Sequence, residues 1–282
     1  MMTLVDTHCH IHEATLDDEI GLSEDQQITR SKWIKAGSPK PEDIIKRAKE
    51  AGVTKLICVG TTASDSELAV RFVADMTDCF ASIGIHPHEA EDHLEYDFDK
   101  FAELAKQPKV VAVGEIGLDY YYEHSSKSAQ KQILVKQLEV AKMHNLPVIF
   151  HVRGSKYAPT GAFNDLFAIL SDFEGVRGVV HSFTADNATL DKILALGLYI
   201  GLNGIMTFTK DQSQLEVAKQ VPTDKLLLET DAPYLTPNPH RGKICEPMYL
   251  RETAVFLAGL RGEKLEDLAR YTTDNARKLF KI

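Results

Sequence analysis

Eight short apolar segments recur along this chain of 282 residues, and amphipathic segments separate them. The apolar segments are rich in Val, Ile and Leu on both faces, as expected of parallel strands that are buried on both sides of a sheet. Strands that alternate with helices, with no linker between two halves of the chain, predict one (β/α)8 barrel domain over residues 1–282. The predicted strands are Thr3–Asp6, Lys55–Val59, Cys79–Ile83, Val110–Val113, Pro147–Phe150, Gly178–Val180, Leu198–Ile200 and Lys225–Leu228.

The amphipathic segments predict the helices of this barrel. An open doubly wound sheet is the alternative fold, but it normally has a glycine-rich phosphate loop after its first strand. Here the first strand leads into Asp6-Thr7-His8-Cys9-His10, which disfavours a nucleotide-binding sheet. The predicted helices are Pro41–Ala51, Ser64–Asp75, Phe98–Gln107, Gln130–Met143, Phe163–Phe173, Asn187–Leu196, Gln214–Gln220, Tyr249–Leu260, Leu265–Ala269 and Asp274–Phe280.

The composition limits the classes of protein to which the chain can belong. Lys and Arg total 32 against 41 Asp and Glu, which gives a net charge of −9. This charge argues against a broad basic nucleic-acid surface, although metal ions can still hold a nucleic-acid substrate. No apolar run approaches the roughly 18 residues of a membrane span, and no obligate protein partner is indicated. The four cysteines form no CxxC pair. We therefore expect reduced thiols and a cytoplasmic location.

Six potential metal ligands follow five different predicted strands. Each emerges from an apolar strand at its C-terminal end, which is the end that carries the active site in (β/α)8 barrels. Buried imidazoles and carboxylates at such positions are costly unless they are paired or bound to a metal. The predicted ligands are His8, His10, Glu115, His151, His181 and Asp231.

The number and type of these ligands predict two divalent cations. Six protein ligands exceed the requirement of one tetrahedral catalytic ion, and they suit two ions about 3.5–4 Å apart. We assign His8, His10 and Asp231 to one ion and His151 and His181 to the other, with Glu115 as the bridge. Asp231 has a second predicted role as the acceptor of a proton from the attacking water. The alternatives are a buried ion pair for Glu115 and a helix cap for Asp231.

Three further side chains are predicted near the same end of the barrel. His86 and Arg153 are predicted to contact substrate phosphate, Arg153 through its bidentate guanidinium. A hydrogen bond to the loop backbone is the alternative for His86. Glu229, two residues before Asp231, is predicted to orient a ligand. We assign no chemistry to the other histidines, which are His12, His88, His93, His124, His144 and His240.

These motifs together resemble the TatD family of metal-dependent deoxyribonucleases within the amidohydrolase superfamily. The resemblance implies hydrolysis of DNA phosphodiesters, often from the 3′ end, with two divalent cations. By the same resemblance, the six predicted ligands correspond to the metal ligands of the family. His86 and Arg153 correspond to residues near the substrate phosphate. The motifs that carry it are Asp6-Thr7-His8-Cys9-His10, Gly84-Ile85-His86-Pro87-His88, Gly114-Glu115-Ile116-Gly117-Leu118-Asp119-Tyr120, His151-Val152-Arg153, His181-Ser182-Phe183, Leu228-Glu229-Thr230-Asp231-Ala232-Pro233-Tyr234-Leu235-Thr236-Pro237 and Thr273-Asp274-Asn275-Ala276-Arg277-Lys278-Leu279-Phe280.

Two segments depart from the family pattern. The stretch at about residues 13–37 is a predicted insertion at the barrel rim, and the segment 154–161 is also extended. The first half of the insertion is acidic (Glu13, Asp17, Asp18, Glu19, Glu24 and Asp25) and is expected to repel a continuous polyanion. In its second half Trp33 lies among Arg30, Lys32 and Lys35. One hypothesis has Trp33 stack on a terminal base; the other has it pack into the barrel rim.

The sequence therefore predicts a metal-dependent hydrolase of DNA phosphodiester bonds, with single-stranded DNA or 3′ ends as its substrate. The predicted reaction is that of a 3′-5′ exodeoxyribonuclease, in which two metal ions activate a water. Zinc, manganese and magnesium all remain open as the metal. The first alternative is hydrolysis of another ester or amide at the same metal site, for example an aminoacyl ester on tRNA. The second is a non-catalytic barrel that serves as an interaction platform.

Overall fold

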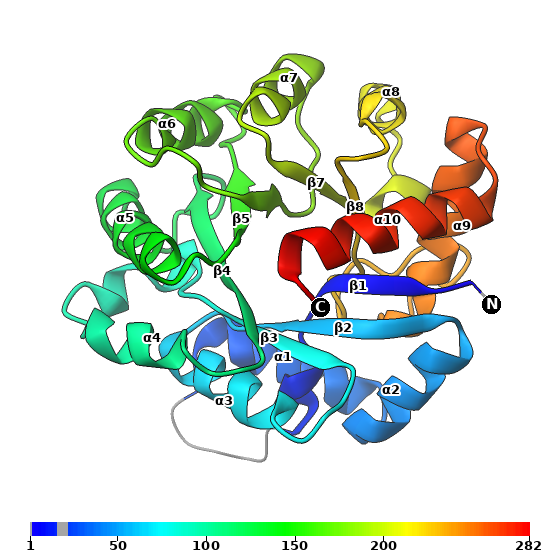
Figure 1. Ribbon diagram of the computed structural model, residues 1–282, viewed down its shortest axis with the longest axis horizontal. Helices are drawn as coiled ribbons and strands as arrows, with labels where there is room; N and C mark the ends of the chain where they lie inside the picture. The colour runs from blue at the N-terminus through cyan, green and yellow to red at the C-terminus, as the bar shows by residue number, and fades with distance from the viewer. Residues whose placement is uncertain (1, 16–21) are drawn as a thin grey trace.

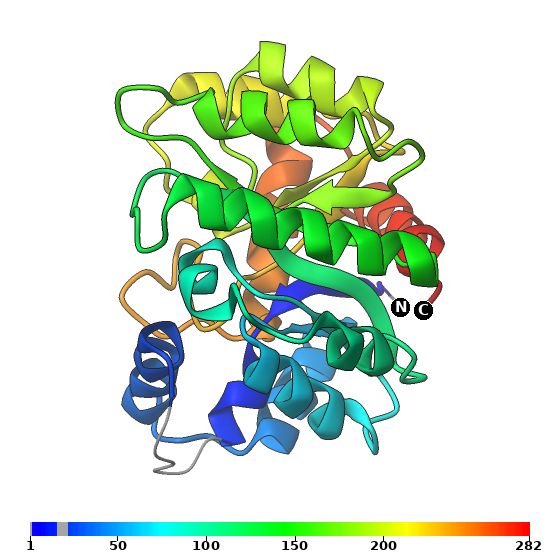
Figure 2. The same ribbon diagram turned by 90° about the vertical axis from the view of Figure 1, so that its left-hand side faces the viewer.

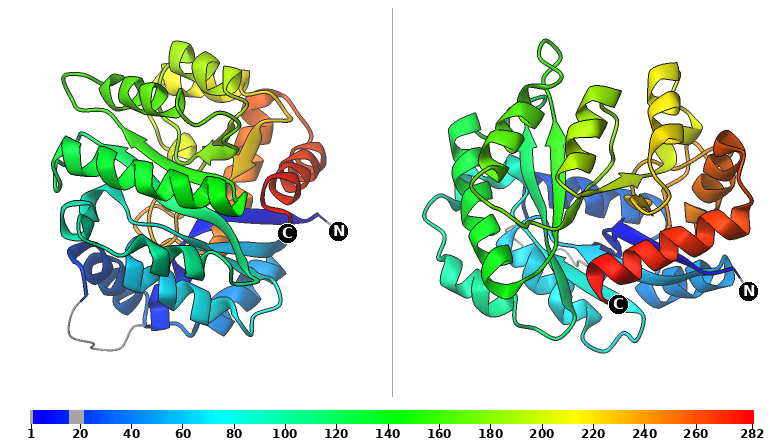
Figure 3. Two further views of the ribbon diagram at one scale, coloured as in Figure 1. Left: turned by 60° about the vertical axis from the view of Figure 1, so that its left-hand side comes forward. Right: turned by 45° about the horizontal axis from the view of Figure 1, so that its top comes forward.

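The computed structural model describes residues 2–15 and 22–282 and confirms the (β/α)8 barrel. The described residues form an eight-stranded parallel sheet in the order β1 to β8, with helices around it (Figures 1 and 3). Its strands are β1 (Leu4–Cys9), β2 (Val53–Val59), β3 (Cys79–Ile83), β4 (Val110–Asp119), β5 (Val148–Arg153), β6 (Gly178–Val180), β7 (Tyr199–Leu202) and β8 (Leu226–Leu228). Its helices are α1 (Glu24–Lys35), α2 (Pro41–Glu50), α3 (Ala63–Val73), α4 (Phe98–Leu104), α5 (Lys127–His144), α6 (Gly161–Leu170), α7 (Asn187–Ala195), α8 (Gln212–Gln220), α9 (Leu250–Arg261) and α10 (Leu265–Phe280).

Contacts between β1 and the segment after β8 close the barrel. The backbone N–H of Asp231 donates to the carbonyl oxygen of His8 at 2.8 Å, and Cys9 forms a parallel bridge with Ala232. The buried Asp6 carboxylate accepts hydrogen bonds from the backbone and the hydroxyl of Thr230, at 2.9 and 2.6 Å. The first and last strands are thereby fixed to each other at the point where three predicted ligands emerge.

Four strands run further at their C-terminal ends than the sequence predicts; one of them, β7, ends at Leu202 and not at Ile200. The prediction ends β1 at Asp6, β4 at Val113 and β5 at Phe150, whereas these strands continue to Cys9, Asp119 and Arg153. The extension of β4 pairs with β5 from Ile116 onward, so polar residues there still have ladder partners. His8, Glu115 and His151 consequently lie within strands, where the backbone is fixed by neighbours on both sides.

One end of the barrel is plugged by the last helix. The sequence predicts two helices, Leu265–Ala269 and Asp274–Phe280, but α10 is continuous across them. Thr272, which is a weak helix former, donates its hydroxyl to the carbonyl of Leu268 within the helix. Ala276, Leu279 and Phe280 of α10 pack against the apolar barrel interior formed by side chains such as Val5, Ile149 and Leu227. The buried polar residues His8, Glu115 and Asp119 lie toward the C-terminal ends of their strands.

The insertion at the rim contains the 3-10 helix Ile11–Thr15 and helix α1. Ser23 begins α1 with a capping box, in which Ser23 and Gln26 exchange side-chain-to-backbone hydrogen bonds. In Figure 2 the two chain termini lie together on one side, and α1 lies on the other. Helix α1 therefore lies near the C-terminal ends of the strands, next to His10, which follows β1. No helix within the described residues is long and apolar enough to cross a membrane.

Candidate metal centre

The carboxylate of Glu115 lies at the middle of the predicted ligands. One of its oxygens is 2.7 Å from Nδ1 of His151 and 3.6 Å from Nε2 of His181. The other oxygen is 3.3 Å from Nε2 of His8. Burial alone would raise the pKa of Glu115, but His8, His181 and a further histidine, His86, hold it well below its usual value. Glu115 is thus an anion that faces the imidazoles of His8, His86, His151 and His181.

The carboxylate of Asp231 lies close to two other predicted ligands, His8 and His10. Its Oδ1 lies 3.7 Å from Nε2 of His8 and 3.5 Å from Nε2 of His10. Bonds of about 2.0–2.2 Å to one ion would place ligand atoms at such separations. Asp231 has φ of +62°, a left-handed conformation that is uncommon for residues other than glycine and recurs at functional sites. Its backbone bond to His8 holds it in that conformation.

Three of the histidines have one ring nitrogen close to an outer oxygen atom. Nδ1 of His10 is 2.8 Å from the carbonyl oxygen of Val59. Nδ1 of His181 is 2.9 Å from Oε1 of Glu229, and Nε2 of His151 is 3.0 Å from Oδ2 of Asp119. Metal-binding histidines characteristically donate their second N–H in this way, because it sets the tautomer and the ring orientation. The other ring nitrogen of each faces the carboxylate of Glu115 or Asp231.

His8 provides the direct test of whether these residues fit a metal. Its ring is fully buried, and neither ring nitrogen has a hydrogen-bond partner within the described residues. Burial, and then the neighbouring His181, lower the pKa of His8, so the ring is neutral. A buried nitrogen lone pair without a partner is costly in a protein interior, and coordination of a cation would satisfy it. The donor set, which is rich in imidazole, fits divalent zinc or manganese better than magnesium, which prefers oxygen ligands.

The imidazole of His86 faces the same cluster. Its Nδ1 accepts the backbone N–H of His88 at 3.2 Å, which leaves the proton of the neutral ring on Nε2. Nε2 lies 3.7 Å from Oε1 of Glu115. Burial, with a contribution from His151, lowers the pKa of His86 to about 3. The ring is therefore neutral and presents an N–H to the centre, as a contact to substrate phosphate requires.

Arg153 lies outside the ligand cluster. It is exposed at the end of β5, and its guanidinium lies over the rings of Tyr121 and Tyr122, at 4.2 and 4.8 Å from their centroids. Within the described part of the chain no carboxylate lies at ion-pair distance from this cation. Its charge is available to an anion that approaches the open end of the barrel.

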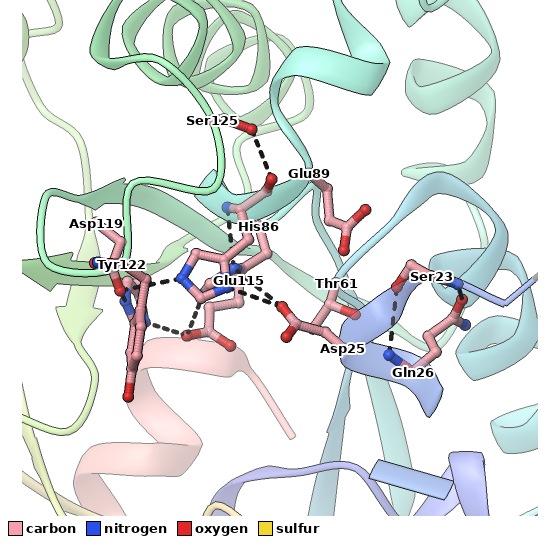
Figure 4. A network of polar contacts seen from close by, with 12 residues as sticks. Ser23, Asp25, Gln26, Thr61, His86, Glu89, Glu115, Asp119, Tyr122 and Ser125 are labelled. Carbon is pink, nitrogen blue, oxygen red and sulfur yellow. Dashed lines mark hydrogen bonds and ion pairs between the residues drawn. The ribbon is translucent and has the colours of Figure 1, made fainter. Parts of the chain in front are cut away.

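Figure 4 shows a chain of polar contacts that the sequence reasoning missed. His88, to which no chemistry was assigned, lies between two carboxylates: Nδ1 is 3.0 Å from Asp25 and Nε2 is 3.3 Å from Asp119. Burial opposes its charge, but these two hydrogen bonds raise the pKa of His88 to about 9. Asp119 could have been found, since it follows Glu115 by four residues along an extended strand and therefore shares its face. Asp25 could not, because it comes from the insertion.

The structure decides between the two hypotheses for Trp33. Its side chain is 1% exposed, and its indole Nε1 donates to the carbonyl oxygen of His10 at 3.2 Å. Stacking of Trp33 on a terminal base is therefore wrong, and packing into the barrel rim is confirmed. The prediction for Glu13 is also wrong, because this side chain is buried and burial raises its pKa well above the usual value. The other acids Asp17, Asp18 and Glu19 lie outside the described residues.

Known proteins resemble the chain over nearly its whole length. A family model described as TatD related DNase matches residues 5–281. The uncharacterized metal-dependent hydrolase YabD of Bacillus subtilis is 34% identical over 281 residues, which cover 99% of each chain. The 3′-5′ ssDNA/RNA exonuclease TatD of Erwinia billingiae is 36% identical and covers 86% of this chain and 93% of its own. The crystal structure of YJJV, a TatD homolog from Escherichia coli, has a TM-score of 0.80 at 28% identity and covers 99% of this chain and 98% of its own. The chain therefore belongs to the TatD family of metal-dependent hydrolases.

Proposed function

We propose that this chain is a two-metal phosphodiesterase that hydrolyses DNA from the 3′ end. The observation that carries the proposal is the position of Glu115, whose two oxygens face His8 on one side and His151 and His181 on the other. A carboxylate between two groups of imidazoles is the arrangement expected of a bridging ligand. The similar Erwinia protein described as a 3′-5′ ssDNA/RNA exonuclease supports the choice of substrate.

The proposed ligands divide into the two groups that the sequence predicts. His8, His10 and Asp231 would hold one cation, His151 and His181 the other, and Glu115 both. Such a pair of cations, when bound, polarises the scissile phosphate, lowers the pKa of the attacking water and stabilises the leaving oxygen. The carboxylates of Glu229 and Asp119 orient the rings of His181 and His151.

Two side chains act on the substrate and on the proton. The Nε2–H group of His86 donates a hydrogen bond to a non-bridging phosphate oxygen. The low pKa of His86 keeps the ring neutral at every working pH. Asp231 accepts the proton that leaves the attacking water. Burial raises its pKa, but a hydrogen bond from His10 and the charges of nearby histidines lower it below the usual value. Asp231 is therefore ionised and able to receive a proton.

The test compares metals and substrates on chelator-stripped protein. We would reload it with zinc, manganese or magnesium and offer a 3′-labelled single-stranded DNA, a carboxylic ester and an aminoacyl-tRNA mimic. The proposal expects hydrolysis of the DNA with at least one of these metals. Asp231→Asn is expected to lower that rate by at least about 10²-fold, the low end for general base catalysis. Hydrolysis of the ester or of the aminoacyl-tRNA mimic, with no cleavage of DNA, would contradict the proposal.

A further inference from the structure

Three aromatic side chains at the open end of the barrel are exposed to solvent. Among the residues that the structure describes, the most exposed Phe, Tyr and Trp side chains are Tyr121, Tyr122 and Tyr157, at 48, 52 and 91%. Tyr121 and Tyr122 follow β4, and Tyr157 lies between β5 and α6. All three therefore belong to loops at the C-terminal ends of strands, where the candidate metal centre lies. Large exposed aromatic side chains that cluster at one place mark a binding surface.

The two neighbouring tyrosines are held in a fixed relation to the metal ligands. Oδ1 of Asp119 accepts the backbone N–H groups of Tyr121 and Tyr122 at 2.8 and 3.1 Å. The other oxygen of the same carboxylate contacts Nε2 of His151 at 3.0 Å. The Tyr122 ring is 5.5 Å from the ring of His88, and Figure 4 shows Tyr122 beside Asp119. One carboxylate thus positions both a predicted metal ligand and the exposed aromatic pair.

Cations accompany these rings. The guanidinium of Arg153 lies over Tyr121 and Tyr122, and Nζ of Lys156 is 5.9 Å from the Tyr157 centroid. The segments 120–127 and 153–161 carry three basic residues and one acid, Glu123, in a chain whose net charge is −9. We call Tyr121, Tyr122, Arg153, Lys156 and Tyr157 the aromatic–cation wall. Aromatic rings with interspersed cations form the surfaces on which single-stranded nucleic acids bind.

We propose that the aromatic–cation wall is a subsite that binds the bases of a single-stranded polynucleotide beside the scissile phosphate. This subsite rests on the proposed function. The part of the substrate that it recognises is the unpaired bases. Tyr121 and Tyr122 stack on bases, which accepts any base because every base has a π-face, while Arg153 holds a neighbouring phosphate. A duplex does not offer its base faces, since they are stacked on one another. The wall therefore selects unpaired strands without selecting their sequence.

The experiment separates base stacking from every other effect of the tyrosines. Fluorescence anisotropy of the manganese-loaded protein measures binding of a phosphorothioate hexathymidylate and of an abasic phosphorothioate hexamer with the same charge. Tyr121→Ala combined with Tyr122→Ala is expected to weaken hexathymidylate binding by about tenfold or more. Binding of the abasic hexamer is expected to stay unchanged. Tyr121→Phe with Tyr122→Phe keeps both rings and is expected to bind as the wild type does.

A control variant and a second substrate make the outcomes distinguishable. Met143 is 71% exposed at the end of α5, on the plugged side of the barrel, so Met143→Ala should leave binding of both hexamers unchanged. Equal losses on the two hexamers, or no loss on either, would overturn the subsite. Hydrolysis of bis(p-nitrophenyl) phosphate and of hexathymidylate is measured in parallel. Base-dependent binding without hydrolysis of either would support the subsite and overturn the proposed function.

Discussion

The indole Nε1 of Trp33 donates a hydrogen bond to the backbone carbonyl oxygen of His10, 3.2 Å away. Trp33 belongs to α1 in the insertion, and His10 follows β1 as a predicted metal ligand. The side chain of Trp33 is among the largest fully buried ones in the described chain. Helix α1 is therefore hydrogen-bonded to the backbone of His10, a predicted metal ligand.

Replacement of Trp33 by alanine is expected to destabilise the protein by about 3–5 kcal/mol, because a buried indole leaves a large cavity. The free energy of unfolding in urea measures this change. Ile34→Ala, at an exposed position in the same helix, serves as the control and should change stability by about 0.5 kcal/mol or less. A Trp33→Ala variant as stable as the wild type would show that α1 packs only loosely on the barrel.

The pair of Glu229 and His181 yields a prediction about metal affinity. Oε1 of Glu229 lies 2.9 Å from Nδ1 of His181 and accepts the backbone N–H of Ser182 at 2.6 Å. Glu229→Gln removes the charge that orients the ring and raises its basicity. We expect metal to bind about 10–100-fold more weakly in calorimetric titrations of the stripped protein. Glu216→Gln, on the exposed surface of α8, should leave that affinity unchanged. Unaltered affinity in Glu229→Gln would contradict this effect of the Glu229 charge.

His86 should act on the substrate and not on the metal. Its Nδ1 is occupied by the backbone N–H of His88, so its Nε2 carries a proton. His86→Asn is expected to keep the metal content of the wild type and to lower the turnover of DNA by about 10²-fold, as for loss of one donor to a transition state. Metal analysis and kinetics on the same preparation check both halves. Loss of a metal ion from this variant would instead make His86 a ligand.

His88 predicts a dependence of stability on pH. Its hydrogen bonds to Asp119 and Asp25 raise its pKa to about 9, above the ordinary value of 6.5. The folded protein therefore binds this proton more tightly than the unfolded chain does. The resulting stabilisation is fully present below pH 6.5 and is lost as the pH rises through 9. Urea unfolding of the metal-free protein between pH 6 and 9.5 should show this loss, and His88→Gln should reduce its slope. Curves of equal slope for both proteins would show that His88 is not charged.

Periodicity made the barrel predictable from the sequence, because buried parallel strands have to be apolar on both faces and the helices between them amphipathic. The ends of the strands were predicted too short, since polar residues such as Glu115 and Asp119 interrupt the apolar pattern while the backbone ladder continues. Polar residues at strand ends indicated which side chains converge on the site. The spatial closeness of His8, His10 and Asp231 follows from the closure of the barrel between β1 and β8.

The insertion was the least predictable part of the molecule. Its one tryptophan among cations fitted a base-stacking surface, but that side chain is buried against the backbone at His10, which follows β1. The contact between Asp25 and His88 joins residues that are 63 positions apart, so no local pattern reports it. The exposure of Tyr121 and Tyr122 likewise depends on the conformation of the turn after β4. In this turn the backbone N–H groups of both residues donate to the carboxylate of Asp119.

The metal content of chelator-stripped and reloaded protein tests the central claim, which is a two-metal centre bridged by Glu115. Elemental analysis after removal of free metal, with turnover of single-stranded DNA measured on the same samples, compares the wild type with Glu115→Ala. The account predicts two ions per wild-type chain, and fewer than two ions with almost no turnover in the variant, since both ions lose a shared anionic ligand. Two bound ions and near wild-type turnover in Glu115→Ala would contradict it.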